Sequence, residues 1–135
     1  MYFSIIVPVY NRPEEVNELL ESLAQSDFSE NFEIVVIEDG STLTCENVVN
    51  NYREKLNISY YLKLNSGPGE SRNFGMGLAK GDYFLIFDSD CIIPKNYLTE
   101  VSIALKQNYA DCFGGPDKAL DSFSDIQKAI NFAMT

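Results

Sequence analysis

Short, almost uninterrupted apolar runs alternate along the chain with segments in which apolar residues recur every three or four positions. The apolar runs cover residues 2–9, 33–38, 58–64 and 83–87. Runs of this length are typical of strands that are buried on both faces of a parallel sheet. The periodic segments between them predict amphipathic helices. The order of elements therefore predicts an α/β fold, a mainly parallel sheet with helices on both of its faces.

Helix boundaries are marked by capping and breaking residues. Asn11 and Glu14 form a capping-box pattern ahead of the first helix, and Pro13 suits its first turn. Pro68 is a favourable start and Gly81 a favourable end for a helix after the third strand. Further helices are expected at 48–56, 96–107 and 124–134, a short fifth strand at 112–114, and a long loop at 114–122.

Length and charge restrict the class of protein. The 135 residues fit one domain, without an internal repeat, and the net charge is −10. Such a surface repels phosphate backbones, so nucleic acid is not an expected partner. The chain contains no histidine, which excludes Ser-His-Asp triads and HExxH zinc sites within it.

The cysteines and the N-terminal residues indicate the cellular compartment in which the chain is expected. Cys45, Cys91 and Cys112 are odd in number and far apart, so neither a disulfide framework nor a zinc ribbon is expected. The first apolar run is not preceded by basic residues, and no segment is long enough to span a membrane. These features favour the reducing cytoplasm.

Distinctive polar residues follow each of the first four strands. They are Tyr10 and Asn11, then Asp39, Gly40 and Ser41, then residues 65–72, and finally Asp88 and Asp90. In an open α/β sheet, ligands bind beyond the carboxyl ends of the strands. The convergence of four such groups predicts a ligand site at this edge.

The most specific signal at this edge is Asp88-Ser89-Asp90. Residues i and i+2 of an extended segment point to the same side, and two carboxylates placed there repel each other unless a cation is near. Oxygen ligands favour Mg²⁺ or Mn²⁺. The alternative is a solvated acidic turn; the position directly after a buried strand favours the metal site.

Two further groups could bind a nucleotide. Asp39 could accept from a nucleobase N–H or a ribose hydroxyl, or it could simply cap a turn. Gly67 and Gly69 would let the backbone approach a ligand, and Arg72 could bind phosphate or else form a surface ion pair with Glu70 or another helix neighbour. The spacing of these glycines does not fit a Rossmann fingerprint.

Four segments together resemble the family 2 glycosyltransferases with the GT-A fold. These segments are SIIVPVYNRPEEVNELLESL, VIEDGS, NSGPGESRNFGM and YFLIFDSDCIIP, which occur in the family's order between residues 3 and 94. The resemblance implies that this chain is a nucleotide-sugar-binding domain covering residues 1–135. It also implies a site made of Pro8, Val9, Tyr10, Asp39, Gly67, Arg72, Asp88, Ser89 and Asp90.

Within that site the resemblance implies individual roles. Asp39 would contact the base, and Tyr10 would help to line the nucleoside pocket, although a half-buried aromatic at the sheet edge is the alternative for Tyr10. Arg72 would lie near the base or the diphosphate. Asp90 would ligate the metal directly, with Asp88 nearer the ribose or the metal. The position of Glu38 is usually an Asp in the family.

The implied activity is metal-dependent sugar transfer, with inversion, from a nucleotide sugar to an acceptor hydroxyl in polysaccharide biosynthesis. UDP is the expected nucleotide, and the acceptor could be a saccharide, a lipid-linked molecule or a protein. The catalytic base is expected beyond Thr135, with Asp117 a weak candidate within the chain. Self-association through residues 126–134 and a peripheral position at the inner face of the membrane are further expectations.

Two other functions fit parts of the sequence. An apolar strand followed by Asp-x-Asp also resembles the haloacid-dehalogenase phosphatases, although those carry the motif on the first strand. A non-catalytic nucleotide-sugar-binding module would need only the donor-binding residues. Phosphoenzyme trapping would distinguish the first alternative, and a turnover assay the second.

Overall fold

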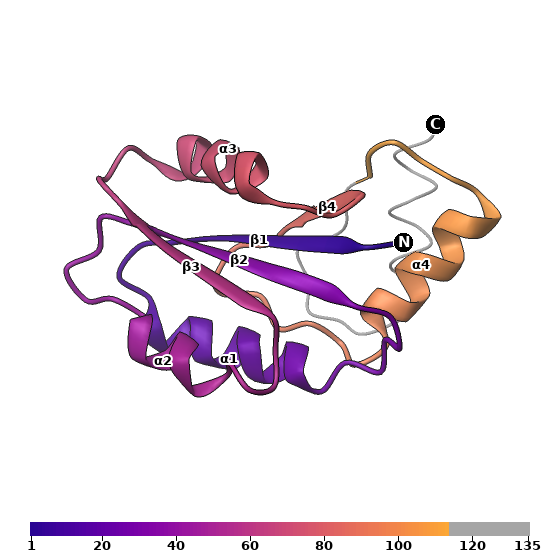
Figure 1. Cartoon of the computed structure of the whole chain (residues 1–135), viewed down its shortest axis with the longest axis horizontal. Coiled ribbons are helices and arrows are strands. Elements are labelled where there is room, and N and C mark those ends of the chain that lie inside the picture. Colours follow the sequence, from indigo (N-terminus) through magenta and orange to yellow (C-terminus); the bar gives the residue numbers. More distant parts are fainter. Residues whose placement is uncertain (114–135) are drawn as a thin grey trace.

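Four parallel strands form the centre of the structure (Figure 1). The computed structural model describes residues 1–113. The strands lie in the order β3-β2-β1-β4, and every neighbouring pair is parallel. Their bounds are β1 (Phe3–Val9), β2 (Phe32–Asp39), β3 (Ile58–Lys63) and β4 (Tyr83–Ile86). The expected parallel sheet is confirmed.

Helices cover both faces of this sheet, also as expected. Helix α3 (Pro68–Leu78) packs across β1 and β2 on one face. On the opposite face lie α1 (Pro13–Ala24) and α2 (Glu46–Asn51) (Figure 1). The buried side chains of α4 (Tyr97–Gln107) join the same core as those of α1. The fold therefore has three layers.

The central strands are apolar on both faces because both faces are covered. Ile6, Val35 and Ile37 form a small core beneath α3. The alternate positions of β1 and β2, such as Ile5 and Val36, belong to the larger core beneath α1 and α4. This explains why these two strands read as continuous apolar runs rather than as alternating ones.

Several element boundaries differ from expectation. The helix predicted over 48–56 ends at Asn51, where Asn50 and Asn51 are weak helix formers and single turns follow. Helix α3 ends at Leu78, before Gly81. Residues 112–113 of the expected fifth strand are not in a strand. The loop and helix expected over 114–134, and Asp117, lie outside the described residues.

Cys45 lies in the core as a buried free thiol. Burial, followed by the nearby Glu38 carboxylate, raises the pKa of the Cys45 thiol far above its ordinary value. Since the thiolate is the reactive form, Cys45 is an inert core residue. Among the helices of residues 1–113, none combines the length and the apolar character needed to cross a bilayer.

Ser71 leads to a test of the packing beneath α3. Its side chain is fully buried, yet its hydroxyl has no hydrogen-bond partner in the described part of the chain. An unsatisfied buried polar group is unfavourable, and alanine is the better helix former. We expect Ser71→Ala to raise the free energy of unfolding by about 1 kcal/mol in a urea titration.

Ser22→Ala is the matched control, with the opposite expected sign. The Ser22 hydroxyl donates to the Leu19 carbonyl oxygen at 2.7 Å and accepts from the Ile93 N–H at 3.0 Å. Its loss should lower the free energy of unfolding by about 1 kcal/mol. A destabilised Ser71→Ala variant would mean that the Ser71 hydroxyl is satisfied.

Candidate functional site

The four groups of polar residues do meet at one edge of the sheet. Val9 at the end of β1 pairs with Glu38, and Asp39 pairs with Lys63, the last residue of β3. Because the strands are parallel, the segments that leave them begin side by side. The segment after β4 starts at the same edge and carries Asp88, Ser89 and Asp90. We call this side of the molecule the carboxyl edge.

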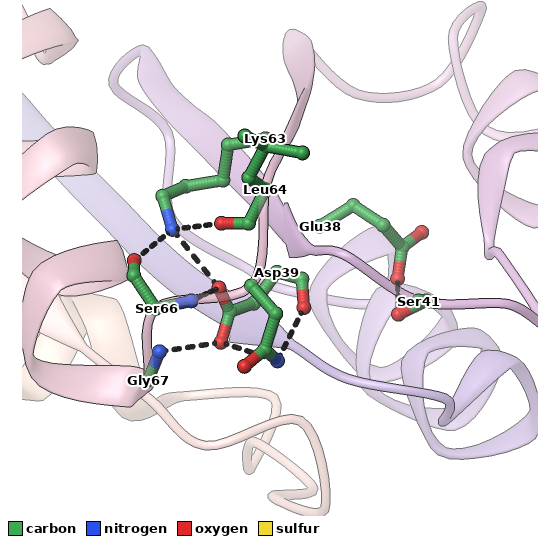
Figure 2. A network of polar contacts seen from close by, with 8 residues as sticks. Glu38, Asp39, Ser41, Lys63, Leu64, Ser66 and Gly67 are labelled. Carbon is green, nitrogen blue, oxygen red and sulfur yellow. Dashed lines mark hydrogen bonds and ion pairs between the residues drawn. The ribbon is translucent and has the colours of Figure 1, made fainter.

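Asp39 is the most extensively bonded residue of the carboxyl edge (Figure 2). Its Oδ1 accepts from Lys63 Nζ and from the Ser66 N–H, both at 2.9 Å. Its Oδ2 accepts from the Gly67 N–H at 3.0 Å and from Asn65 Nδ2 at 3.3 Å. The carboxylate thus holds the whole loop between β3 and α3, which is more than the turn cap considered from the sequence.

The electrostatics of Asp39 favour the ionised form. Its side chain is only 6% exposed, and that burial by itself raises the pKa of the carboxyl group. The Lys63 ammonium and the N–H groups of Ser66 and Gly67 outweigh burial, so the pKa lies below its ordinary value. Asp39 is therefore a carboxylate acceptor, as recognition of a base N–H requires.

Glu38, beside Asp39 in sequence, points to the opposite side of β2 (Figure 2). It is fully buried and accepts from the Cys45 N–H and the Tyr60 hydroxyl, both at 2.8 Å, and from the Ser41 hydroxyl. Burial, then Glu38 itself, raises the pKa of Tyr60, which stays a donor. Sequence reasoning noted only the unusual residue type here and missed this network.

Asn11 does not cap α1 as predicted; the N-cap is Arg12, without a side-chain hydrogen bond. Asn11 has a φ of 53°, a left-handed conformation that asparagine tolerates better than most residues. Its Oδ1 accepts from the N–H groups of Thr42 and Leu43, both at 2.9 Å, and its own N–H donates to Ser41 Oγ at 2.8 Å. Asn11 thereby fastens the segment after β1 to the segment after β2.

Arg72 and the Asp88-Ser89-Asp90 segment lie together on the open side of the edge. Arg72 Nη2 contacts Asp88 Oδ1 at 3.4 Å, and the Asp88 side chain is 66% exposed. The predicted alternative partner of Arg72, Glu70, makes no such contact in the described chain. Asp90 is also exposed, and no ion pair or hydrogen bond within residues 1–113 holds its carboxylate. Both carboxylates are therefore accessible to a ligand.

The remaining predicted site residues have different environments. Val9 and Ser89 are buried, Pro8 is half-buried, and Tyr10 is 53% exposed beyond the end of β1. Gly67 has a φ of 99° and donates its N–H to Asp39. Tyr10 is thus exposed enough to stack on a planar ligand, whereas the side chains of Val9 and Ser89 are buried.

The donor set suits a hard divalent cation that a ligand helps to hold. No cluster of three or more metal-binding side chains occurs among residues 1–113. Mg²⁺ and its analogues commonly bind through one or two carboxylates together with substrate phosphates. The segment is not extended, as the sequence predicted, but turns at residues 89–90, where the Cys91 N–H donates to the Asp88 carbonyl oxygen at 3.1 Å. Asp88 and Asp90 are both exposed, so a cation held by them would be shared with substrate phosphates rather than enclosed in an all-protein cage.

The parallel α/β sheet with helices on both faces is that of the GT-A glycosyltransferases. Residues 4–134 match the family described as "Glycosyl transferase family 2", and the chain belongs to this family. It is 41% identical, over 82% of its length, to the poly(ribitol-phosphate) beta-N-acetylglucosaminyltransferase TarS of Staphylococcus aureus. It is 34% identical, over 90% of its length, to a poly(ribitol-phosphate) beta-glucosyltransferase of Bacillus spizizenii.

Solved structures agree with this assignment. The S. aureus TarS 1–349 structure in complex with UDP-GlcNAc covers 90% of this chain with a TM-score of 0.78 and 37% identity. The chain covers 37% of that structure and 20% of each of the two full-length relatives. Family membership and fold decide against the haloacid-dehalogenase alternative. The fold, family and class predicted from sequence are confirmed.

Proposed function

We propose that this chain binds a UDP-sugar at the carboxyl edge and presents it for transfer to an acceptor hydroxyl. The observation that carries the proposal is the convergence of an ionised acceptor, an arginine and two exposed carboxylates at one sheet edge. These residues belong to a chain of glycosyltransferase family 2. The UDP-GlcNAc complex of a 37% identical protein supports uracil as the base.

Each end of the nucleotide has a matching group in this proposal. Asp39 accepts from the imide N–H of uracil, and the exposed Tyr10 ring stacks beside the base. Arg72 gives up part of its contact with Asp88 and donates to the diphosphate instead. The planar guanidinium, with its parallel N–H donors, is suited to phosphate. Pro8 and Gly67 shape the walls around the nucleoside.

Asp88 and Asp90 would hold Mn²⁺ or Mg²⁺, with the diphosphate completing the coordination. When bound, such a cation neutralises the charge that develops on the departing nucleoside diphosphate. The resemblance to inverting family members supports in-line attack by the acceptor. A carboxylate base would then take the proton of the attacking hydroxyl.

The relatives suggest the sugar and acceptor classes. One is named for N-acetylglucosamine transfer and the other for glucose transfer, and both act on poly(ribitol-phosphate). We propose a UDP-linked hexose or N-acetylhexosamine as donor and a polyol-phosphate polymer as acceptor. The acceptor class is the stronger of these two inferences, because both relatives are named for the same acceptor.

Calorimetric titration with nucleotide sugars in Mn²⁺ tests donor binding. We expect UDP-GlcNAc or UDP-glucose to bind, and GDP- and ADP-sugars to bind at least about tenfold more weakly. Asp39→Asn should weaken UDP binding by about 1.5–3 kcal/mol, since a charged hydrogen bond is lost. Equal affinity for all bases, or an unchanged Asp39→Asn variant, would contradict the assignment of Asp39. Absence of binding to any nucleotide sugar would contradict the proposed function itself.

A further inference from the structure

We propose that Lys63 is a positioning residue for nucleobase recognition, which holds Asp39 Oδ1 so that only Oδ2 reads the base. This inference rests on the proposed function, because it concerns how the same site selects its ligand. Lys63 did not stand out in the sequence, since a lysine at the end of an edge strand is ordinarily a solvated charge.

The contacts of Lys63 leave none of its N–H donors unused. Its Nζ donates to Asp39 Oδ1 at 2.9 Å, to the Leu64 carbonyl oxygen at 2.7 Å, and to the Ser66 hydroxyl. An ammonium has three donors, so its hydrogen-bonding capacity is filled (Figure 2). Lys63 therefore joins the end of β2, the end of β3 and the loop before α3 at one point.

The two oxygens of Asp39 are consequently not equivalent. Oδ1 accepts two bonds of 2.9 Å, from Lys63 and from the Ser66 backbone, which fill its two lone pairs. Oδ2 has one good bond from the Gly67 N–H, and a longer one, 3.3 Å, from the exposed Asn65 side chain. Asn65 is the donor most easily displaced, because it also donates to the Asp39 carbonyl oxygen at 2.9 Å.

A single displaceable contact, that between Asn65 and Oδ2, favours one kind of base edge. Uracil presents a single imide N–H between two carbonyl groups, which matches the single position on Oδ2 that Asn65 would vacate. Guanine presents two adjacent donors, which match both oxygens of a carboxylate at once. With Oδ1 occupied by Lys63, Asp39 would accept the uracil edge and lose the second contact to guanine.

Lys63 also keeps Asp39 ionised. The side chains of Lys63 and Asp39 are 15% and 6% exposed, so their attraction is weakly screened. Lys63 is the charged group whose interaction with Asp39 contributes to its lowered pKa; Ser66 and Gly67 contribute neutral N–H donors. Glu38 points to the other side of β2, and Arg72 of α3 pairs with Asp88. Without Lys63, burial would act on Asp39 with less opposition and would raise its pKa.

The test is a set of calorimetric titrations with UDP-GlcNAc at fixed Mn²⁺, between about pH 5 and about pH 8. The phosphates of this donor carry no proton that titrates in that range. For the unsubstituted chain we expect an affinity that does not change with pH. For Lys63→Met we expect at least tenfold weaker binding near pH 5, with partial recovery near pH 8 as Asp39 ionises. The ratio of the affinities for UDP and GDP should also be smaller in Lys63→Met than in the unsubstituted chain.

Three comparisons make the result specific to Lys63. Lys63→Arg keeps the charge and should keep the flat pH profile, even if its melting temperature changes. Lys106→Met removes an equal charge from an exposed position on α4 and should bind as the unsubstituted chain does. In an Asp39→Asn background, Lys63→Met should cause little further loss, because it acts through Asp39.

The outcomes separate this inference from the proposed function. Binding by Lys63→Met with unchanged affinity and a flat pH profile would overturn the role of Lys63 and leave the proposed function standing. If the unsubstituted chain bound no nucleotide sugar, the proposed function would fail, and recognition through Lys63 with it. The Lys63–Asp39 pair itself is checked separately by an NMR titration of the Asp39 carboxyl group in ligand-free protein. Lys63→Arg should leave its pKa low.

Discussion

Gly40→Ala is expected to lower the free energy of unfolding by about 2–5 kcal/mol and to weaken nucleotide binding with it. Gly40 has a φ of 69°, where an L-residue with a Cβ is strained. A Cβ built there would lie 2.6 Å from the Asn65 backbone nitrogen and 2.8 Å from the Asn65 Cβ. The substitution therefore combines backbone strain with a clash against neighbouring backbone.

The clash has a functional consequence because of where it falls. Asn65 lies in the loop whose N–H groups, from Ser66 and Gly67, donate to Asp39. Moving this loop away from β2 would lengthen both hydrogen bonds and displace Lys63 from Oδ1. Urea unfolding followed by circular dichroism measures the stability, and calorimetry with UDP measures the binding.

Gly77→Ala is the matched control within the same chain. Gly77 lies in α3, is exposed, and has no atom within 4 Å of a built Cβ. Alanine there should raise the free energy of unfolding by about 0.5–1 kcal/mol and leave UDP binding unchanged. Equal stability of the Gly40→Ala variant and the unsubstituted chain would show that Gly40 and Asn65 are not in tight contact.

The sheet was predictable because burial on two faces leaves a strong signal. The runs of β1 and β2 have apolar residues at successive positions and so could not be amphipathic strands with one solvent-exposed face. They alternate along the chain with segments of helical periodicity, and this order of strands and helices indicates parallel pairing. Parallel pairing in turn brought Asp39, Arg72 and Asp88 to one edge without any knowledge of contacts. The composition of local segments therefore sufficed for the fold and for bringing these three residues to one edge of the sheet.

The supporting contacts were not predictable, because they join residues far apart in sequence. Asn11 has the spacing of a capping box, but the loop after β2 offers its side chain two backbone N–H groups 31 and 32 positions away. Lys63 and Asp39 are 24 positions apart, and Glu38 and Tyr60 are 22 apart. Such pairs follow from strand register, which sequence periodicity alone does not fix.

Asp90→Asn is expected to remove the effect of Mn²⁺ on UDP binding, a loss of about 10²-fold in affinity at saturating metal. The amide keeps the shape of the side chain but lacks the negative charge that a hard cation requires. In the described chain Asp90 has no competing cation, whereas Asp88 is paired with Arg72 at 3.4 Å. Asp90 is therefore the carboxylate available to the metal before any rearrangement.

Asp88→Asn should have a different signature, which separates the two carboxylates. It removes the partner of Arg72, so we expect weaker UDP binding both in Mn²⁺ and in a chelator, with much of the metal effect retained. Asp111→Asn is the charge control, because Asp111 lies near Tyr83, at the start of β4 and away from the carboxyl edge. Calorimetric titration of UDP in Mn²⁺ and in EDTA measures all three variants. If Asp90→Asn kept the full effect of Mn²⁺ and Asp88→Asn lost it, Asp88 rather than Asp90 would be the metal ligand. Equal affinities in Mn²⁺ and EDTA for the unsubstituted chain would refute a metal-dependent donor site, and Arg72 would then be the principal group that neutralises the diphosphate.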